Sequence, residues 1–157
     1  MSKELDFYKN IFNSNNIRLT TRRIMILKIF LNHKSDHLTV NEIYYLAKEI
    51  YPSIGLATIY RTIEILLKLD LLDHLSLEDG VNRYKFFINK DTNLKAYNKH
   101  HPHLICLDCK KIIDCHYNFI NTIKTEINKS CLFKVTDFEM KFYGYCEKCY
   151  IKRLSNY

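Results

Sequence analysis

Four cysteines in the C-terminal part of the sequence stand in two pairs that have the spacing of metal ligands. Cys106 and Cys109 form one C-x-x-C pair, and Cys146 and Cys149 form the other. Two intervening residues allow both sulfurs of a pair to reach one ion at about 2.3 Å, and two pairs complete a tetrahedral Zn²⁺ site. The alternatives are redox disulfides or an iron–sulfur cluster, but neither pair has a glycine–proline redox context, and the spacing fits neither common ferredoxin pattern. The pattern therefore predicts a structural zinc.

A histidine-rich segment precedes the first cysteine pair. Residues two apart on an extended strand share a face, so His101 and His103 can reach one ion while Cys106 turns to the other side. Asp114 lies on the next expected strand and can approach the same ion. Two imidazoles and a carboxylate suit borderline divalent ions such as Fe²⁺, Mn²⁺, Zn²⁺ or Ni²⁺, which the sequence does not rank. The alternative is a solvated histidine cluster in front of a strand.

Composition places these residues in a folded protein without a membrane span. The chain has 157 residues, of which 47% are apolar and 13% aromatic, enough for one ordinary domain or two small ones. No window approaches the roughly 18 uninterrupted apolar residues of a membrane helix, and no secretory signal is visible. We therefore expect a cytoplasmic protein, whose reducing environment favours metal binding over disulfides. Cys115 and Cys131 lack partner spacing and are expected to be small buried residues.

The net charge of +7 suits a polyanionic partner such as nucleic acid. Four metal-bound thiolates and one Zn²⁺ would lower it to about +5. Solvated lysine faces are the commoner cause of such a charge, so a DNA-binding function must rest on sequence motifs.

Helical periodicity dominates the N-terminal half. Apolar spacing predicts helices within residues 5–31, divided at Thr20 and Thr21. Thr39 and Glu42 form a capping box for a helix that ends near residues 51–53. A further helix is expected from about Ser53 to Asp70.

The order of the next elements predicts a winged helix. The helix after residue 53 exposes Thr58, Tyr60 and Arg61 behind a tight turn, which is helix-turn-helix order. Alternating residues 72–77 and the β-rich residues 82–88 flank a turn at Gly80, and this hairpin would be the wing.

The polar segment 89–99 is predicted to be a domain linker. It separates a DNA-binding domain, residues 1–88, from a metal-binding and dimerisation domain, residues 100–157. The latter is expected to contain short strands near 103–106 and 111–114 and a strand or strand pair within 132–145. Between them a helix is expected over 117–128, with Phe119, Ile120, Ile123 and Ile127 pointing inward. The predicted fold class is α+β, with an N-terminal winged helix followed by a small α/β domain stapled by zinc.

This order of elements resembles the ferric uptake regulator (Fur) family of bacterial metal-dependent repressors. The resemblance extends from about Leu19 to Cys149, nearly the whole chain. Its most specific segments are residues 19–23, 37–44, 52–62 and 143–146.

The resemblance implies a homodimer that binds a double-stranded DNA operator, with a regulatory metal between the two domains. In such proteins metal at the hinge closes the two winged helices into a spacing that fits the operator. By position, the hinge histidine falls on His37, the strand histidines on His101 and His103, and the later carboxylate on Asp114. The resemblance implies no membrane partner, no small organic ligand and no enzymatic activity.

The chain departs from the family at the wing. Where the family usually has an Asp or Glu after an aromatic residue, this sequence has Lys85 after Tyr84. A protonated lysine cannot ligate a cation, so the usual five-ligand set would shrink to four. Fewer oxygen ligands favour four-coordinate Zn²⁺ or leave an open position on Fe²⁺. Asp79 or Asp91 remains a possible replacement.

A second departure concerns the additional metal site of the dimerisation domain. That site usually combines a histidine at the position of His100 with a helix carboxylate and a later histidine. Here the last two positions are Asn121 and Phe138. We expect this site to be absent or weak, with His100 its only candidate ligand.

The resemblance leaves the sensed metal open. We expect Fe²⁺ in the regulatory site, with Mn²⁺ or Zn²⁺ as alternatives. The genes that the protein represses are expected to be metal uptake genes, above all those for iron. An aspartate at the position of Asp114 is often associated with peroxide-sensing members, in which bound Fe²⁺ catalyses oxidation of its own histidine ligands. Lys85 argues against that branch, because it relies on the missing carboxylate. Peroxide sensing and zinc sensing remain alternatives.

Candidate DNA contacts divide into phosphate and base contacts. Arg22 and Arg23, together with Arg83 or Lys85 of the wing, are expected to bind phosphates.

Base contacts are expected from the second helix of the helix-turn-helix. Arg61 can reach guanine acceptors, and Tyr60 and Thr58 can reach thymine methyl groups. The alternative is that Tyr60 packs in the core and Arg61 is merely solvated.

Two other classes of function remain for comparison. A zinc hydrolase or deaminase would need an open metal position and an H-x-E or H-E-x-x-H motif, neither of which the sequence offers. A zinc-stapled interaction module without DNA binding would leave the recognition-helix pattern unexplained.

Overall fold

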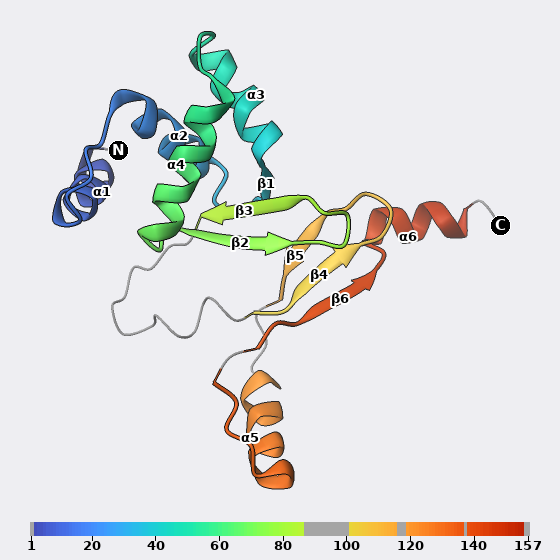
Figure 1. Ribbon diagram of the computed structural model, residues 1–157. Helices are drawn as coiled ribbons and strands as arrows, with labels where there is room; N and C mark the ends of the chain where they lie inside the picture. The colour runs from blue at the N-terminus through green and yellow to red at the C-terminus, as the bar shows by residue number, and fades with distance from the viewer. Residues whose placement is uncertain (1, 87–100, 116–118, 137, 156–157) are drawn as a thin grey trace. The chain divides into compact units, whose positions relative to one another are not determined.

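The computed structural model describes residues 2–86, 101–115, 119–136 and 138–155, and divides into two compact units, Met1–Lys90 and Asp91–Tyr157 (Figure 1). The predicted linker, residues 89–99, lies outside the described residues, so the domain boundaries stay a prediction. No helix in the described part of the chain is long and apolar enough to cross a membrane.

The first unit contains α1 (Ser2–Ser14), α2 (Thr21–Asn32), α3 (Val40–Ile50) and α4 (Leu56–Lys68). Helix α2 begins at the predicted break, where the Thr20 hydroxyl accepts the backbone N–H of Arg23. At α3 the Thr39 side chain accepts the N–H of Glu42 at 3.2 Å, while the Glu42 carboxylate accepts the N–H of Thr39 at 2.7 Å. The capping box is therefore confirmed.

Helices α3 and α4 form the helix-turn-helix, and their inward faces build the core of the unit. Helix α4 begins at Leu56 behind Gly55, later than the expected Ser53, because residues 51–55 make the turn. The core is shared by all four helices and the strands that follow them. Its fully buried side chains include Phe12, Ile26, Leu27, Phe30, Ile43, Ile59 and Leu66.

A three-stranded antiparallel sheet completes the winged helix. Strands β2 (Leu72–Ser76) and β3 (Asn82–Phe86) form the predicted hairpin, whose turn contains Gly80 with a φ of +71°. Strand β1 (Leu38–Thr39) pairs with β3. A two-residue strand has too little alternation to be recognised in a sequence.

The second unit contains the sheet order β5-β4-β6, from β4 (His103–Cys106), β5 (Ile112–Asp114) and β6 (Lys141–Gly144). Strand β4 is antiparallel to β5 and parallel to β6. Helix α5 (Phe119–Cys131) lies between β5 and β6 in the chain, and α6 (Glu147–Leu154) follows β6. The strand expected within 132–145 is only four residues long, and the sequence did not predict α6. The α+β fold class is confirmed.

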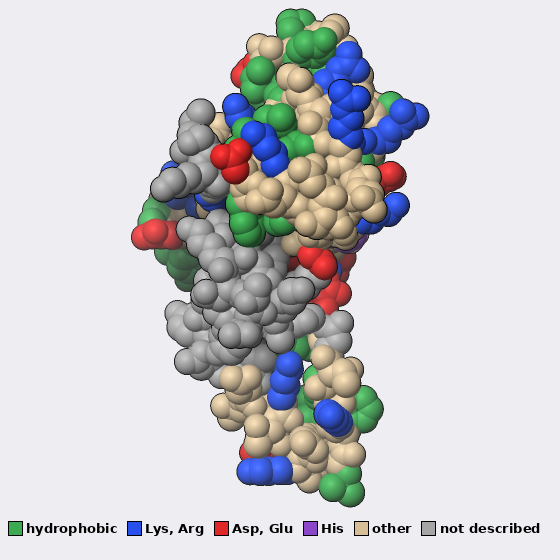
Figure 2. Space-filling view, turned by 90° about the vertical axis from the view of Figure 1, so that its left-hand side faces the viewer, with side chains coloured by type: hydrophobic (Ala, Val, Ile, Leu, Met, Phe, Trp, Pro, Cys, Tyr) green, Lys and Arg blue, Asp and Glu red, His purple; other side chains and the backbone are tan. Residues whose placement is uncertain are grey.

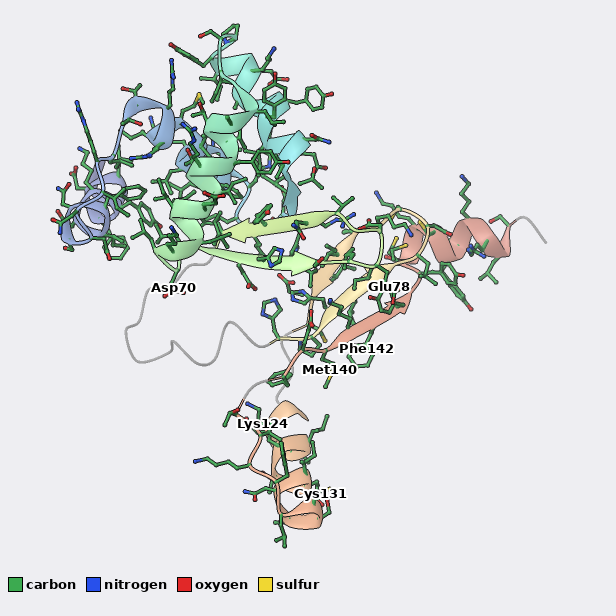
Figure 3. All side chains as sticks on the ribbon, in the orientation of Figure 1. Asp70, Glu78, Lys124, Cys131, Met140 and Phe142 are labelled. Atoms are coloured by element: carbon green, nitrogen blue, oxygen red, sulfur yellow. The ribbon has the colours of Figure 1, made fainter. Side chains whose placement is uncertain are left out.

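Helix α5 differs from its expected packing. Its apolar side was expected to point inward, yet Ile123 is 38% exposed and the following Leu132 and Phe133 are exposed as well. Figure 3 shows side chains projecting from α5 between the labelled Lys124 and Cys131. The described residues therefore leave this side of α5 partly exposed.

Candidate metal centres and DNA-binding surface

The two cysteine pairs converge at one end of the sheet in the second unit. Cys106 ends β4 and lies opposite Gly144 of the parallel strand β6, so the chain delivers Cys146 beside it. The four sulfurs all lie within 4.8 Å of one another, and Cys109 and Cys146 are 3.7 Å apart. Sulfurs of a tetrahedral zinc site are about 3.8 Å apart, as Zn–S bonds of about 2.3 Å require. The cluster therefore fits zinc in number, ligand type and spacing.

The backbone polarises this cluster. The N–H groups of Cys146 and Cys109 point at the Cys106 sulfur, the former from 3.4 Å, and they lower the pKa of Cys106 to about 6. The pKa of the Cys149 thiol is raised to about 12. The main cause is its hydrogen bond to the Cys146 sulfur, and burial among the other sulfurs adds to it. One sulfur is thus prepared as a thiolate, and a divalent cation would supply the charge needed to deprotonate the rest.

A second group of donors lies on the same sheet. His103 and Asp114 are cross-strand partners, and His103 Nδ1 is 3.0 Å from Asp114 Oδ1. His101 Nε2 is also 3.0 Å from that oxygen, and the two imidazole rings are 4.6 Å apart. All three side chains are about nine-tenths buried. Two nitrogens and a carboxylate oxygen aimed at one point, away from water, form a donor set that fits a divalent metal ion.

The recognition helix exposes the residues expected to contact bases. Tyr60 is 48% exposed, Arg61 is exposed and Thr58 is half-buried, while the neighbouring Ile59 is buried. Tyr60 therefore does not pack in the core. Figure 2 shows several lysine and arginine side chains in its upper part.

Comparison with known proteins identifies the family. The model of the "Ferric uptake regulator family" matches residues 14–143. The chain belongs to the ferric uptake regulator family.

Curated relatives within the family are named for two kinds of regulation. The Ferric uptake regulation protein of Bacillus subtilis is 32% identical over 149 residues, which is 95% of this chain and 96% of that protein. The Peroxide-responsive repressor PerR of Staphylococcus saprophyticus is also 32% identical, over 136 residues, 87% of this chain and 84% of that protein. Overall identity therefore does not separate the two branches.

The fold agrees with a solved member of the family. The Fur structure of Helicobacter pylori, described with three functional metal binding sites, matches at a TM-score of 0.76 and 22% identity, covering 95% of this chain and 93% of that one. This likeness and the four-cysteine cluster confirm a winged helix followed by the family's small α/β domain. The chain is thus a Fur-family transcription regulator.

The other predicted ligands of the regulatory metal are His37, His100, Asp79 and Asp91. His37 is half-buried in the first unit, just before β1, and its role as a regulatory ligand stays a prediction. His100 and Asp91 lie outside the described residues. Arg83 donates hydrogen bonds of 2.7 and 3.1 Å to the Asp79 carboxylate, which is therefore engaged in an ion pair within the wing.

Lys85 and Phe138 occupy the positions where this chain departs from the Fur-family ligands. Lys85 is half-buried on β3, in register with Asp73 of β2. Phe138 has the Lys124 ammonium 4.7 Å above its ring, and Asn121 is exposed. Neither Lys85 nor Phe138 offers a metal ligand at neutral pH. Cys115 is half-buried, whereas Cys131, expected to be buried, is exposed at the end of α5 (Figure 3).

The candidate phosphate-binding arginines have contacts of their own. The Arg22 guanidinium lies 5.4 Å from the centre of the Tyr51 ring, and its hydrogen bond to Tyr51 lowers the pKa of that phenol. Arg23 donates to the backbone carbonyl of Arg18. Arg83 is only 8% exposed and also donates to the Val81 carbonyl. Arg22 keeps the most exposed position of the three, whereas Arg83 is already paired within the wing.

Three residues beside the four cysteines were not singled out by their spacing. Asp108 lies between Cys106 and Cys109, Tyr145 precedes Cys146, and Arg153 is four residues after Cys149. Their proximity to ligands was the only available signal, because their mutual contacts depend on how the two cysteine pairs are brought together.

Proposed function

We propose that this chain is a metal-dependent DNA-binding repressor that controls metal uptake genes, with Fe²⁺ as the regulatory ion. The observation that carries the proposal is the convergence of His101, His103 and Asp114 on one buried point. Such a site, separate from the four cysteines and in a chain that also has a winged helix, suits a sensor better than a structural role. The repressor is expected to act in the cytoplasm.

The structural ion would be a Zn²⁺ held by Cys106, Cys109, Cys146 and Cys149. It would join the end of β4 to the start of α6, fixing the small second unit. With all four positions taken by protein ligands, this zinc would have no place for a substrate. The zinc would therefore have a structural role, and we expect that the protein is not an enzyme.

The regulatory ion would be held by His101, His103 and Asp114, with His37 as a fourth ligand. The Asp114 oxygen now faces both imidazoles, and an ion would take over these contacts. The ion can favour the DNA-competent arrangement only by the difference between its affinities for the competent and incompetent states. A ligand from each unit would provide that difference.

Zn²⁺ and Mn²⁺ are the alternative regulatory ions, and peroxide sensing is the alternative function. Because Lys85 stands in place of a carboxylate, the site has fewer oxygen ligands, and this favours ions that bind well to nitrogen ligands. Asp114 and the relatives named PerR favour peroxide sensing, in which iron would oxidise its histidine ligands. The lysine at position 85, in place of a carboxylate ligand, instead favours iron or zinc sensing without oxidation of the histidine ligands.

The expected partners are a second copy of the chain and a DNA operator. Leu104, Ile113 and Phe142 are in register across the sheet of the second unit, and each is between 36 and 47% exposed. They line a hollow of about 220 Å³ with Tyr145. Figure 3 shows the labelled Phe142 on β6. An exposed apolar row of this kind suits a homodimer interface.

The test is binding to the DNA upstream of the chain's own gene, followed by fluorescence anisotropy at fixed salt without oxygen. Protein stripped by a chelator would be restored with Fe²⁺, Mn²⁺ and Zn²⁺ in turn. We expect iron to restore tight binding at the lowest concentration, and His103→Ala to abolish that response. Tight binding without any metal would contradict the sensor.

Two further outcomes separate the alternatives. Loss of binding when peroxide is added to the iron-loaded protein, with oxidised His101 or His103, would indicate the peroxide-sensing branch. Failure to bind duplex DNA at low salt with every metal would favour the zinc-stapled interaction module, because phosphate contacts alone give salt-dependent binding.

A further inference from the structure

The guanidinium of Arg153 forms a bidentate ion pair, referred to below as the fork, with the carboxylate of Asp108. Arg153 Nε donates to Asp108 Oδ2 at 2.9 Å, and Nη2 donates to Oδ1 at 2.7 Å. Two parallel hydrogen bonds between a planar cation and a carboxylate are stronger and more directional than a single ion pair.

This fork connects the two cysteine pairs. Asp108 lies inside the first pair, while Arg153 lies on α6, the helix that begins after Cys146 and contains Cys149. The same guanidinium lies 4.0 Å from the centre of the Tyr145 ring, next to Cys146. One side chain thus contacts residues adjacent to ligands of both pairs.

Helix α6 has few other attachments in the described part of the chain. It is eight residues long, has no buried residue, and exposes Tyr150, Ile151 and Leu154 by more than half. A helix of two turns without a buried face has little stability of its own. Its position therefore depends on the cysteine cluster and on Arg153.

The turn of the first pair also needs support. Lys110, directly after Cys109, has a φ of +58°, a left-handed conformation that is unfavourable for a residue with a side chain. The backbone N–H of Lys110 closes the turn on the Cys106 carbonyl at 3.0 Å. A side chain that holds Asp108 from outside opposes relaxation of this turn.

We propose that Arg153 is a positioning residue of the four-cysteine site, which clamps α6 to the Asp108 turn and thereby slows zinc release. When one Zn–S bond opens, the clamp keeps Cys146 and Cys149 near the ion, so rebinding competes with loss. The pair is neutral as a whole, so its effect comes from tethering and not from compensating the thiolate charge. The proposal rests on the zinc site proposed above.

The test is the rate of zinc release from the full-length chain into excess 4-(2-pyridylazo)resorcinol at fixed salt. Arg153→Ala should accelerate release by about tenfold, the size expected when an outer partner of a metal ligand is lost. Arg153→Lys keeps the charge without the fork and should be intermediate. Lys152→Ala removes an equal charge from the neighbouring exposed position and should release zinc at the unaltered rate.

A second set of measurements approaches the clamp from its other side. Asp108→Asn should accelerate release as Arg153→Ala does, and the double variant should be no faster than either, because one interaction is lost in all three. In zinc-loaded Arg153→Ala, iodoacetamide labelling followed by mass spectrometry should modify Cys146 and Cys149 faster than in zinc-loaded Lys152→Ala, whereas Cys106 and Cys109 should react at the same rate in both variants. General unfolding would expose all four together.

The outcomes separate the clamp from the zinc site. Zinc content of the unaltered chain is measured first, and a chain that holds no zinc would overturn both proposals. Zinc-loaded Arg153→Ala that releases its ion no faster than Lys152→Ala would overturn the clamp alone. If Arg153→Ala fails to fold, Asp108→Asn decides, and release at the unaltered rate would overturn the clamp.

Discussion

At position 85 this chain has a lysine where Fur-family proteins usually have a carboxylate ligand. Lys85 lies half-buried on β3, in register with Asp73, so its charge can be held within the wing. A neighbouring cation would repel a metal ion, and the site would rely on imidazole nitrogens and Asp114 alone. The sensed metal is thus expected to depend on this one residue.

Lys85→Glu should restore an oxygen ligand and remove a positive charge. We expect the Fe²⁺ or Mn²⁺ concentration needed for half-maximal DNA binding to fall by about tenfold relative to that of Zn²⁺, since hard oxygen ligands favour the former ions. Anisotropy titrations with each metal measure this ratio. Lys68→Glu makes the same charge change at an exposed position of the same unit. An unchanged ratio in Lys85→Glu would show that position 85 is not part of the site.

The cysteine cluster should titrate unevenly when zinc is removed. The pKa of Cys106 is lowered to about 6, so its thiolate dominates from mildly acidic pH upward, whereas the pKa of Cys149 is raised to about 12. Because the thiolate is the reactive form, iodoacetamide should modify Cys106 first, with its rate rising through about pH 6. Mass spectrometry of the chelated protein across pH measures each site. Equal rates at all four cysteines would contradict this prediction.

At the scale of elements, the wing and the recognition helix use their arginines differently. Arg83 is buried on β3 and pairs with Asp79, while Arg61 is exposed on α4. The paired arginine holds the hairpin turn, since Asp79 also accepts the backbone N–H of Val81. Stability and DNA recognition are therefore expected to separate between these two residues.

Arg83→Ala should lower the free energy of unfolding by about 1–2 kcal/mol, because charged hydrogen bonds near the surface are lost and Asp79 remains partly exposed to water. Urea unfolding followed by circular dichroism measures the loss. Arg61→Ala should leave that stability unchanged and instead weaken operator binding by about 1–3 kcal/mol, with zinc content and dimerisation retained. Unchanged operator affinity at fixed salt would remove Arg61 from the set of base contacts.

At the scale of the whole molecule, the described residues of the second unit leave apolar side chains exposed. The row of Leu104, Ile113 and Phe142 is exposed on the sheet, and Leu132 and Phe133 are exposed after α5. Exposed apolar side chains in register favour association. This distribution supports the proposed homodimer and gives α5 a reason for its apolar spacing.

Phe142→Asp should convert the dimer to monomer at micromolar concentration, because a charge would then be buried in the apolar row. Sedimentation velocity of the zinc-loaded protein measures the change, and zinc content should be retained. Phe7→Asp alters an equally exposed aromatic residue in the first unit and should remain dimeric. A dimeric Phe142→Asp variant would exclude this face as the interface.

Features that depend on neighbouring residues were predictable. The capping box of Thr39 and Glu42 and the break at Thr20 were confirmed because caps act within one helical turn. The alternation that places His101 and His103 on one side of an extended segment follows from strand geometry, and the structure brings both to Asp114. Each C-x-x-C pair is likewise a local pattern, and the structure adds the convergence of the two.

Taken alone, the sequence predicted the winged helix from caps and periodicity and two groups of candidate metal donors from ligand spacing, and its resemblance to the Fur family indicated the family. Only the tertiary structure decided that Arg83 serves Asp79, that Arg153 grips Asp108 from 45 residues away, and that Ile123 of α5 is exposed. Side-chain partners and burial depend on which segments the fold brings together. The residue pattern within one segment does not indicate which distant segment will contact it.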